Sequence, residues 1–314
     1  VWRVDLLDDG ETIGMMFLQE RAKRARLAAR RALRSTDAML LLAPSIWAVA
    51  GREEDAARVL ASSLPALAKA TGADLLRLHR QEDGAARTLA GALARAGRRH
   101  RLAPYTEAHR IRLGEDLAES LAHVGAKRLR DIRRRRRKLE AEAPGPVLLS
   151  RERGDLFARP GFEATWTRIE DLRRRSWQLE ATQEAGLAEP EAVLAHSRDL
   201  ARAWSRAGGL DIAMLEVAGQ LVAAHVNVVV RGVVWMIVMF HDAAWRSHGV
   251  GMTLLLHMLE DGHARGDRLH ELGGEANDWK EAWSNERMPV WDVVAPLPTW
   301  RGRLWGARER WRGR

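Results

Sequence analysis

Segments with apolar residues at helical spacing alternate along this chain with short, mostly apolar segments. Apolar residues at helical spacing predict helices over four ranges: 53–71, 84–96, 162–179 and 191–207. Alternating or β-branched runs predict strands at 1–7, 12–18, 39–43, 46–50, 74–79, 111–113, 147–150, 212–217, 221–230, 233–240, 270–272 and 290–294. Helices interleaved with strands indicate an α/β (α+β) protein with mixed twisted sheets and flanking helices.

One long helix is predicted over 115–142, where apolar residues fall along one side. Ala143-Pro144-Gly145-Pro146 follows it and cannot continue a helix, so this segment predicts a boundary. We therefore expect an N-terminal half over 1–114, a linking basic helix over 115–146 and a C-terminal half over 147–314. The chain begins inside a predicted strand, so we expect native residues to precede Val1.

The most informative stretch lies in the C-terminal half. The apolar run 233–240 predicts a buried strand, and it is followed by Arg246-Ser247-His248-Gly249-Val250-Gly251 and then by helical spacing. Glycine lets the backbone approach a ligand closely, and the first turn of a helix presents unpaired N–H groups and the positive end of its dipole. This order predicts a phosphate site. A glycine turn that only connects strand and helix is the alternative.

The composition narrows the kinds of site that remain. The 314 residues are 46% hydrophobic and 30% charged, which suits one large or two modest globular domains. The chain has no cysteine, which excludes disulfides, thiolate zinc sites and a cysteine nucleophile. The glycine stretch lacks both the third glycine of a dinucleotide fingerprint and the lysine of a P-loop. No metal-ligand spacing and no membrane-spanning apolar run occur, so we expect no bound metal and a cytoplasmic location, or one peripheral to the inner membrane.

Several motifs resemble those of a known family. R-x-x-G-x-G at 246–251 is similar to the acyl-CoA pyrophosphate loop of the GNAT N-acyltransferase superfamily. The segments that resemble one subfamily are L-R-R-R-S-W at 172–177, A-G-Q-L-V-A at 218–223, G-E-A-N-D-W-K-E-A-W at 274–283 and the Arg-rich helix at 127–139. Together they resemble the acetyltransferase-like family of cellulose and exopolysaccharide biosynthesis, a relative of the Fem peptidyltransferases. Trp279 departs from its usual Tyr, and Ser247-His248-Gly249 departs from the common Ser-Pro-Gly.

The resemblance implies two tandem GNAT-like halves, with the cofactor bound in the second. It implies direct transfer of an acyl group from acetyl-CoA or another acyl-CoA to an amine or hydroxyl acceptor. That acceptor would be a small molecule, a saccharide or a peptide, in polysaccharide or cell-envelope biosynthesis. Backbone N–H groups near 238–240 would polarise the acyl carbonyl. The residues expected to hold the cofactor are Phe240, Arg246, Ser247, His248, Gly249, Val250, Gly251 and Met252.

Acyl transfer to an amine also needs a general base, and four residues are candidates: His225, His241, Asp242 and Glu271. His241 follows the central strand directly, and its ordinary pKa of about 6.5 suits proton abstraction. Glu271 lies on the next strand, across the cleft that the resemblance implies. We rank Glu271 and His241 first, with a structural role as the alternative for each. Lys280, near the same cleft, would steady a phosphate or the oxyanion.

Positive charge is concentrated in one segment, the basic tract from Lys127 to Lys138. It carries nine basic residues and one acid, whereas the whole chain has a net charge of +9. Such a tract is either a solvated helix face or a binding surface for an anionic acceptor, a membrane lipid or nucleic acid. A Fem-like transferase that uses aminoacyl-tRNA and a non-catalytic GNAT-like module that binds polyanions are therefore the alternative functions. The Trp- and Arg-rich range 298–314 predicts a helix that packs on the sheet or touches a membrane.

Overall fold

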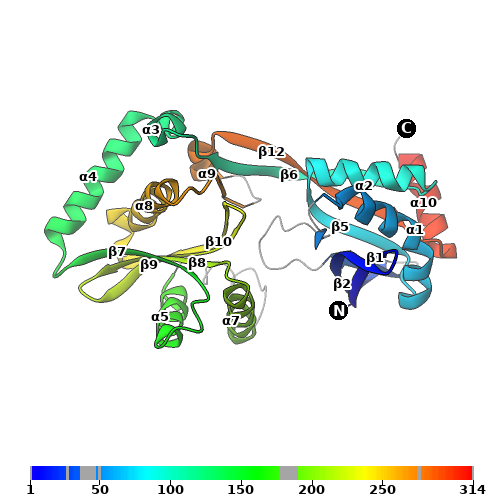
Figure 1. Cartoon of the computed structure of the whole chain (residues 1–314), viewed down its shortest axis with the longest axis horizontal. Helices are drawn as coiled ribbons and strands as arrows, with labels where there is room; N and C mark the ends of the chain where they lie inside the picture. Colours follow the sequence, from blue (N-terminus) through cyan, green and yellow to red (C-terminus); the bar gives the residue numbers. More distant parts are fainter. Residues whose placement is uncertain are drawn as a thin grey trace. The chain divides into compact units, whose positions relative to one another are not determined.

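The computed structural model describes residues 2–25, 28–35, 47–48, 51–176, 190–273 and 277–312. The chain forms two compact units (Figure 1). The first contains residues 1–108 and 287–314, and the second contains residues 109–273 and 277–286. The division expected from the sequence grouped these segments differently, because it placed 287–314 in the second half and treated the basic helix as a separate linker. The strand expected over 39–43 lies outside the described residues.

The first unit is a sheet with packed helices. Its strands are β1 (Trp2–Asp8), β2 (Glu11–Ala25), β3 (Ala28–Ser35), β4 (Trp47–Ala48), β5 (Leu75–Glu82), β6 (Arg101–Arg112) and β12 (Glu286–Pro296). Its helices are α1 (Glu53–Thr71), α2 (Asp83–Arg95) and α10 (Trp300–Arg312). The strand order is β1-β2-β3-β5-β12-β6, with β4 paired to β2. β6 and β12 each also supply residues to the second unit.

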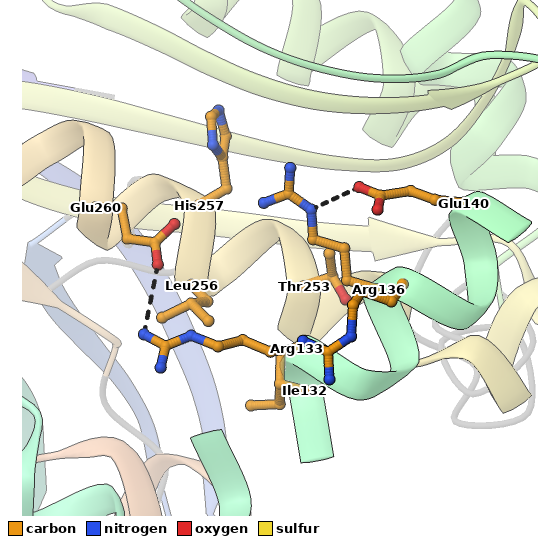
Figure 2. Close-up of a pocket in the computed structure, with 9 residues that line it drawn as sticks. Ile132, Arg133, Arg136, Glu140, Thr253, Leu256, His257 and Glu260 are labelled. Atoms are coloured by element: carbon orange, nitrogen blue, oxygen red, sulfur yellow. Dashed lines mark hydrogen bonds and ion pairs between the residues drawn. The ribbon is translucent and has the colours of Figure 1, made fainter. Parts of the chain in front are cut away.

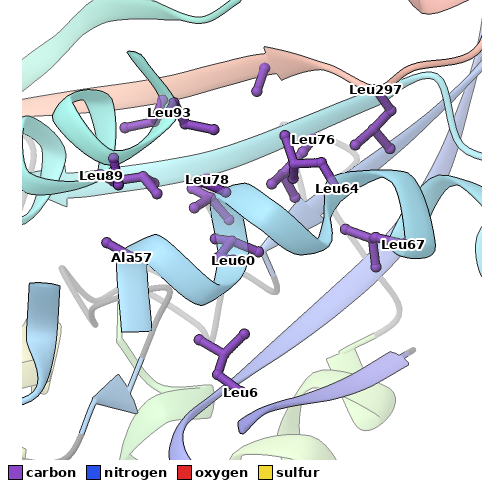
Figure 3. Close-up of a cluster of buried hydrophobic side chains, with 14 of the residues drawn as sticks. Leu6, Ala57, Leu60, Leu64, Leu67, Leu76, Leu78, Leu89, Leu93 and Leu297 are labelled. Carbon is purple, nitrogen blue, oxygen red and sulfur yellow. The ribbon is translucent and has the colours of Figure 1, made fainter. Parts of the chain in front are cut away.

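Helix α1 supplies much of the first unit's core, and its predicted bounds are confirmed. Its inward leucines recur at helical spacing and are Leu60, Leu64 and Leu67. They pack with Leu76 and Leu78, which alternate inward on β5 (Figure 3). Burying a leucine side chain stabilises a fold by about 1.5–3 kcal/mol. The helix ends at Gly72, whose φ of 64° is a left-handed conformation that glycine adopts without steric penalty.

The second unit begins with α3 (Leu117–Ser120), the 3-10 turn η1 (Ala122–Val124) and α4 (Ala126–Glu142). It continues with β7 (Val147–Gly154), α5 (Phe162–Arg174), α7 (Pro190–Arg206), β8 (Leu210–Val217), β9 (Gln220–Val230) and β10 (Val233–His241). It closes with the 3-10 turn η2 (Ala243–His248), α8 (Val250–Ala264), β11 (Leu269–Glu271) and α9 (Asp278–Trp283). The strand order is β6-β11-β10-β9-β8-β7. Helix α5 ends at Arg174, short of the predicted residue 179, and residues 177–189 lie outside the description.

Different helices cover the two faces of this second sheet (Figure 1). On one face the apolar side of α5, with Phe162 and Trp166, packs with residues of β8 and β9 and with Phe240. On the other face α8 packs on the sheet, and Leu139 of α4 joins the same cluster as Val250 of α8. Helix α8 therefore lies between the sheet and α4, which brings the basic tract next to the helix that follows the glycine stretch.

The single helix predicted over 115–142 was wrong. The chain there forms α3, a 3-10 turn and α4, and the break falls at Gly125. Gly125 has a φ of 84°, which a right-handed helix cannot contain. The apolar period runs through this position unbroken, because Leu121 and Val124 before the break and Ile132 after it are buried in one cluster. A periodic pattern alone therefore could not reveal the break.

Candidate active site

The site starts where two parallel strands part. β10 pairs with β11 only through its first residues, and the last pair joins Trp235 to Glu271. β10 continues to His241 while paired with β9 alone, and its register on β9 shifts between Met236 and Val238. Among the described strands, the edge of β10 beyond Trp235 therefore has no partner on the β11 side. An extended ligand can hydrogen-bond to such an edge as an added strand does.

The first turn of α8 follows the end of the same strand, across the 3-10 turn η2. Gly249 has a φ of 64° and precedes α8, with its N–H bonded to the carbonyl of Arg246. The N–H of Thr253 returns to the carbonyl of Gly249. The three positions between them, Val250 to Met252, form the first turn of α8, where backbone N–H groups lack an acceptor within the helix, and the described residues supply no side-chain cap at Gly249. These orphan donors and the positive end of the helix dipole suit a phosphate.

The side chains of the predicted cofactor residues lie in different environments. Arg246 and Ser247 are exposed, and the ring of His248 lies 3.3 Å from the Ser247 hydroxyl and 3.5 Å from the Glu142 carboxylate of α4. Val250 and Phe240 are buried. Phe240 packs on the α5 face, so only its backbone is available to a ligand at the parted strands. The structure thus places Arg246 on the exposed turn that leads into α8 and directs the Phe240 side chain elsewhere.

His241 lies against the first turn of α8. A Cβ atom built on Gly251 would be 3.6 Å from Nδ1 of His241 and 3.5 Å from Sδ of Met239. The side chains of His241 and Met239 therefore lie next to the helix backbone at Gly251. Burial lowers the pKa of His241, and the positive charge of Arg246 lowers it further. The imidazole is therefore neutral at neutral pH, beside the first turn of α8.

Glu271 lies in a buried ion pair. It has no exposed surface, and Arg110 of β6 donates from Nε to its Oε2 at 2.5 Å. A second carboxylate, on Glu286, is 3.6 Å from Nη1 of the same arginine. Because β-strands rise about 3.3 Å per residue, the six residues from Trp235 to His241 span about 20 Å. Glu271, paired to Trp235, and His241 therefore lie at opposite ends of the parted edge and cannot act on the same atom.

The remaining candidates occupy structural environments. His225 is completely buried, which lowers its pKa to about 3 and keeps it neutral. The Asp242 carboxylate caps η2 and accepts a hydrogen bond from Nε of Arg175 at 3.0 Å. Lys280 is half-buried, with its Nζ 5.9 Å from the centre of the Trp279 ring, a cation–π distance. The first residues of its motif, 274–276, lie outside the description.

Several partners of these residues could not be predicted from the sequence. Arg110, Arg175 and Glu142 are distant in sequence from the residues they contact, so no local spacing marks them. In the parts of the chain that the structure describes, no group of three metal-ligating side chains occurs. None of the helices described is both long and apolar enough to cross a membrane.

Residues 126–281 match the family model described as acetyltransferase (GNAT) domain. The match starts at the first residue of α4 and ends within α9, so it contains the parted strands and the glycine stretch. Fold and match together define this protein as an acyltransferase of the GNAT type. Its second unit carries the GNAT acetyltransferase domain, and the predicted fold class is confirmed. The match does not confirm the narrower cellulose and exopolysaccharide family.

Two solved structures share the fold over most of both chains. L-PGS from Bacillus licheniformis is 12% identical with a TM-score of 0.56, and the similarity covers 95% of this chain and 85% of that one. FemX is 11% identical with a TM-score of 0.57, and the similarity covers 93% and 87%. At these identities the likeness shows a common fold. No curated protein sequence matches the chain significantly.

Proposed function

We propose that the second unit transfers an acyl group from acetyl-CoA or another acyl-CoA directly to an amine or hydroxyl acceptor. One observation carries this proposal: the first turn of α8, which no described side chain caps, stands at the end of a strand whose neighbour has parted from it. The pyrophosphate of acyl-CoA fits the donors of residues 250–252, with Arg246 as the cation beside them. The pantetheine arm, which carries two amides, fits the free edge of β10.

This placement puts the thioester far from the phosphates, near the register shift between Met236 and Val238. There the acceptor nitrogen attacks the thioester carbonyl, the new C–N bond forms, and the C–S bond breaks. Glu271 takes the proton of the acceptor: its carboxylate is buried and paired with Arg110, but it lies opposite Trp235, where the free edge of β10 begins. CoA leaves as a thiolate that is then protonated. Backbone N–H groups on the free edge of β10 stabilise the oxyanion. His241, about 20 Å from Trp235 along the strand, is assigned to the wall of the phosphate site.

The acceptor is proposed to be a saccharide, peptide or small molecule of polysaccharide or cell-envelope biosynthesis, on the sequence resemblance alone. A Fem-like use of aminoacyl-tRNA is the second candidate, and it is favoured by the fold shared with FemX and by the exposed arginines of α4. A non-catalytic GNAT-like polyanion module is the third, and the donors beside parted strands argue against it. One titration separates the three.

Purified protein is expected to bind acetyl-CoA with micromolar affinity in both low and high salt. Arg246→Ala should weaken that affinity tenfold to a hundredfold, because a hydrogen bond to a charged group contributes about 1.5–3 kcal/mol. Isothermal titration measures both constants. Arg206→Ala, which removes another exposed arginine, from α7, is the control and should bind normally. Binding that collapses with salt would assign the ligand to the basic tract, and no binding at all would favour the tRNA-dependent or non-catalytic functions.

Gly251→Val is expected to abolish acyl-CoA binding while the fold stays near intact. The φ of Gly251 is not in the left-handed region, and a Cβ there meets only ordinary contacts, so the backbone at this position admits a side chain. The added methyl groups would cover the N–H donors. Gly249 is the poorer test, because its φ of 64° strains any other residue. Titration and a thermal melt check the prediction, and a variant that melts and binds like the wild type would refute the loop assignment.

A further inference from the structure

A groove of about 290 Å³ lies between α4 and α8 within the second unit, outside the parted strands (Figure 2). Helix α4 lines it with Arg133, Arg136 and Arg137, and α8 lines it with Thr253 and His257. Three arginines of the basic tract thus form one wall of this groove.

The arginines of this wall are only partly neutralised. Nε of Arg136 donates to Glu140 at 2.9 Å, which leaves its two terminal nitrogens turned toward His257 (Figure 2). Nη2 of Arg133 is 3.9 Å from Glu260, too far for a hydrogen bond. Arg137 makes no ion pair with any described residue. Three guanidinium groups therefore face two carboxylates, and the recess has a surplus of donors and of positive charge.

The α8 wall contains a buried hydroxyl without a partner. Thr253 is 3% exposed, and among the described residues its Oγ1 makes no hydrogen bond. A buried polar atom without a hydrogen bond costs about 1–3 kcal/mol of stability, and a bound ligand can supply the missing hydrogen-bond partner. The neighbouring His257 is half-buried, and burial lowers its pKa, so it offers a neutral N–H donor beside the arginines.

This groove adjoins the glycine loop. Arg135 lies against it from α4, with Cδ 3.1 Å from where a Cβ of Gly249 would stand. Thr253 is one helical turn beyond Gly249, which is about 6 Å at 1.5 Å rise per residue. A ligand whose phosphates bind the N–H groups at the start of α8 can therefore place a second group in the groove, if that group is about the length of one sugar away from those phosphates.

We propose that the groove between α4 and α8 binds a phosphate monoester, and that under the proposed function this is the 3′-phosphate of CoA. Guanidinium groups pair with phosphate through parallel N–H donors, and the Thr253 hydroxyl and His257 ring complete the set. The basic tract, which lies outside the strands that hold the rest of the cofactor, then selects acyl-CoA over its dephosphorylated form. A separate phosphorylated compound is the other source of the same group.

The test compares acetyl-CoA with 3′-dephospho-acetyl-CoA at one ionic strength, by titration into wild type and the Arg136→Ala/Arg137→Ala variant. Wild type is expected to prefer acetyl-CoA by about tenfold to a hundredfold, and the variant by less than about twofold. Arg134→Ala is the matched control, because Arg134 is on the same helix but does not line the groove, and it should keep the wild-type preference. Circular dichroism checks that each variant is folded.

Inorganic phosphate, titrated into the same proteins, separates the two sources. If wild type does not distinguish the two CoA forms but loses phosphate binding on Arg136→Ala/Arg137→Ala, the groove is a phosphate site for a separate compound. If the variant changes neither the preference between the two CoA forms nor the binding of inorganic phosphate, the proposal is overturned. Failure of both CoA forms to bind wild type would instead refute the proposed function. The titration with inorganic phosphate would still decide whether the groove binds phosphate.

Discussion

Glu271→Gln is expected to lower kcat by about a hundredfold to ten-thousandfold, because a positioned general base contributes about that much to rate. The substitution keeps the shape of the side chain and removes its ability to take a proton. Affinity for acetyl-CoA should change little, since Glu271 lies at the far end of the parted edge from the phosphate donors. Steady-state kinetics with a responsive acceptor, beside titration of acetyl-CoA, separates the effect on kcat from the effect on binding.

His241→Gln is the contrasting variant. Its ring lies against Gly251 at the phosphate end, so its loss should raise the KM for acyl-CoA and leave kcat near the wild-type value. Glu271→Gln also removes the charge that pairs with Arg110, so its melting temperature has to be measured beside its activity. A folded Glu271→Gln enzyme with normal kcat, together with a His241→Gln enzyme that has lost kcat, would reverse the two assignments.

Arg151→Met is expected to reduce the free energy of unfolding of the second unit by about 3–5 kcal/mol, the typical cost of removing one partner of a buried ion pair. The side chain of Arg151 is 1% exposed, and its Nη2 lies 2.9 Å from Asp211 and 3.1 Å from Asp267. Its Nη1 also donates to the carbonyl of Met258 on α8. Methionine fills similar space but leaves two buried carboxylates short of a cation.

Chemical denaturation followed by circular dichroism measures this loss. Arg153→Met is the matched comparison, since Arg153 pairs with the same Asp211 and Asp267 but is 22% exposed, and its loss should cost clearly less. An Arg151→Met protein as stable as the wild type would show that the buried cluster is not held by this arginine. Acetyl-CoA binding should survive in both variants wherever the unit remains folded.

Local patterns predicted the elements that position the site. The apolar run of β10 and the glycines after it gave the strand and the start of α8, because both signals lie within about twenty consecutive residues. Helix α1 was predicted with its observed bounds, since its periodic leucines end at a glycine suited to a helix terminus.

Contacts between distant segments could not be predicted in this way. The ion pair of Glu271 with Arg110 joins strands 161 positions apart, and nothing near either residue marks the other. Likewise, the arginines of the basic tract on α4 cannot be told apart from their sequence. Only the packing of α4 on α8 separates arginines that line a groove from those that face solvent.

The order of segments has a consequence for synthesis on the ribosome. The first unit holds residues from both ends of the chain, and β12, between β5 and β6 in its sheet, belongs to the final part. All of the second unit has been translated before the first unit receives that strand. The acyltransferase domain is thus able to fold first, while the sheet of the first unit still lacks β12 and has unpaired strand edges. Unpaired strand edges in a nascent chain are prone to aggregation.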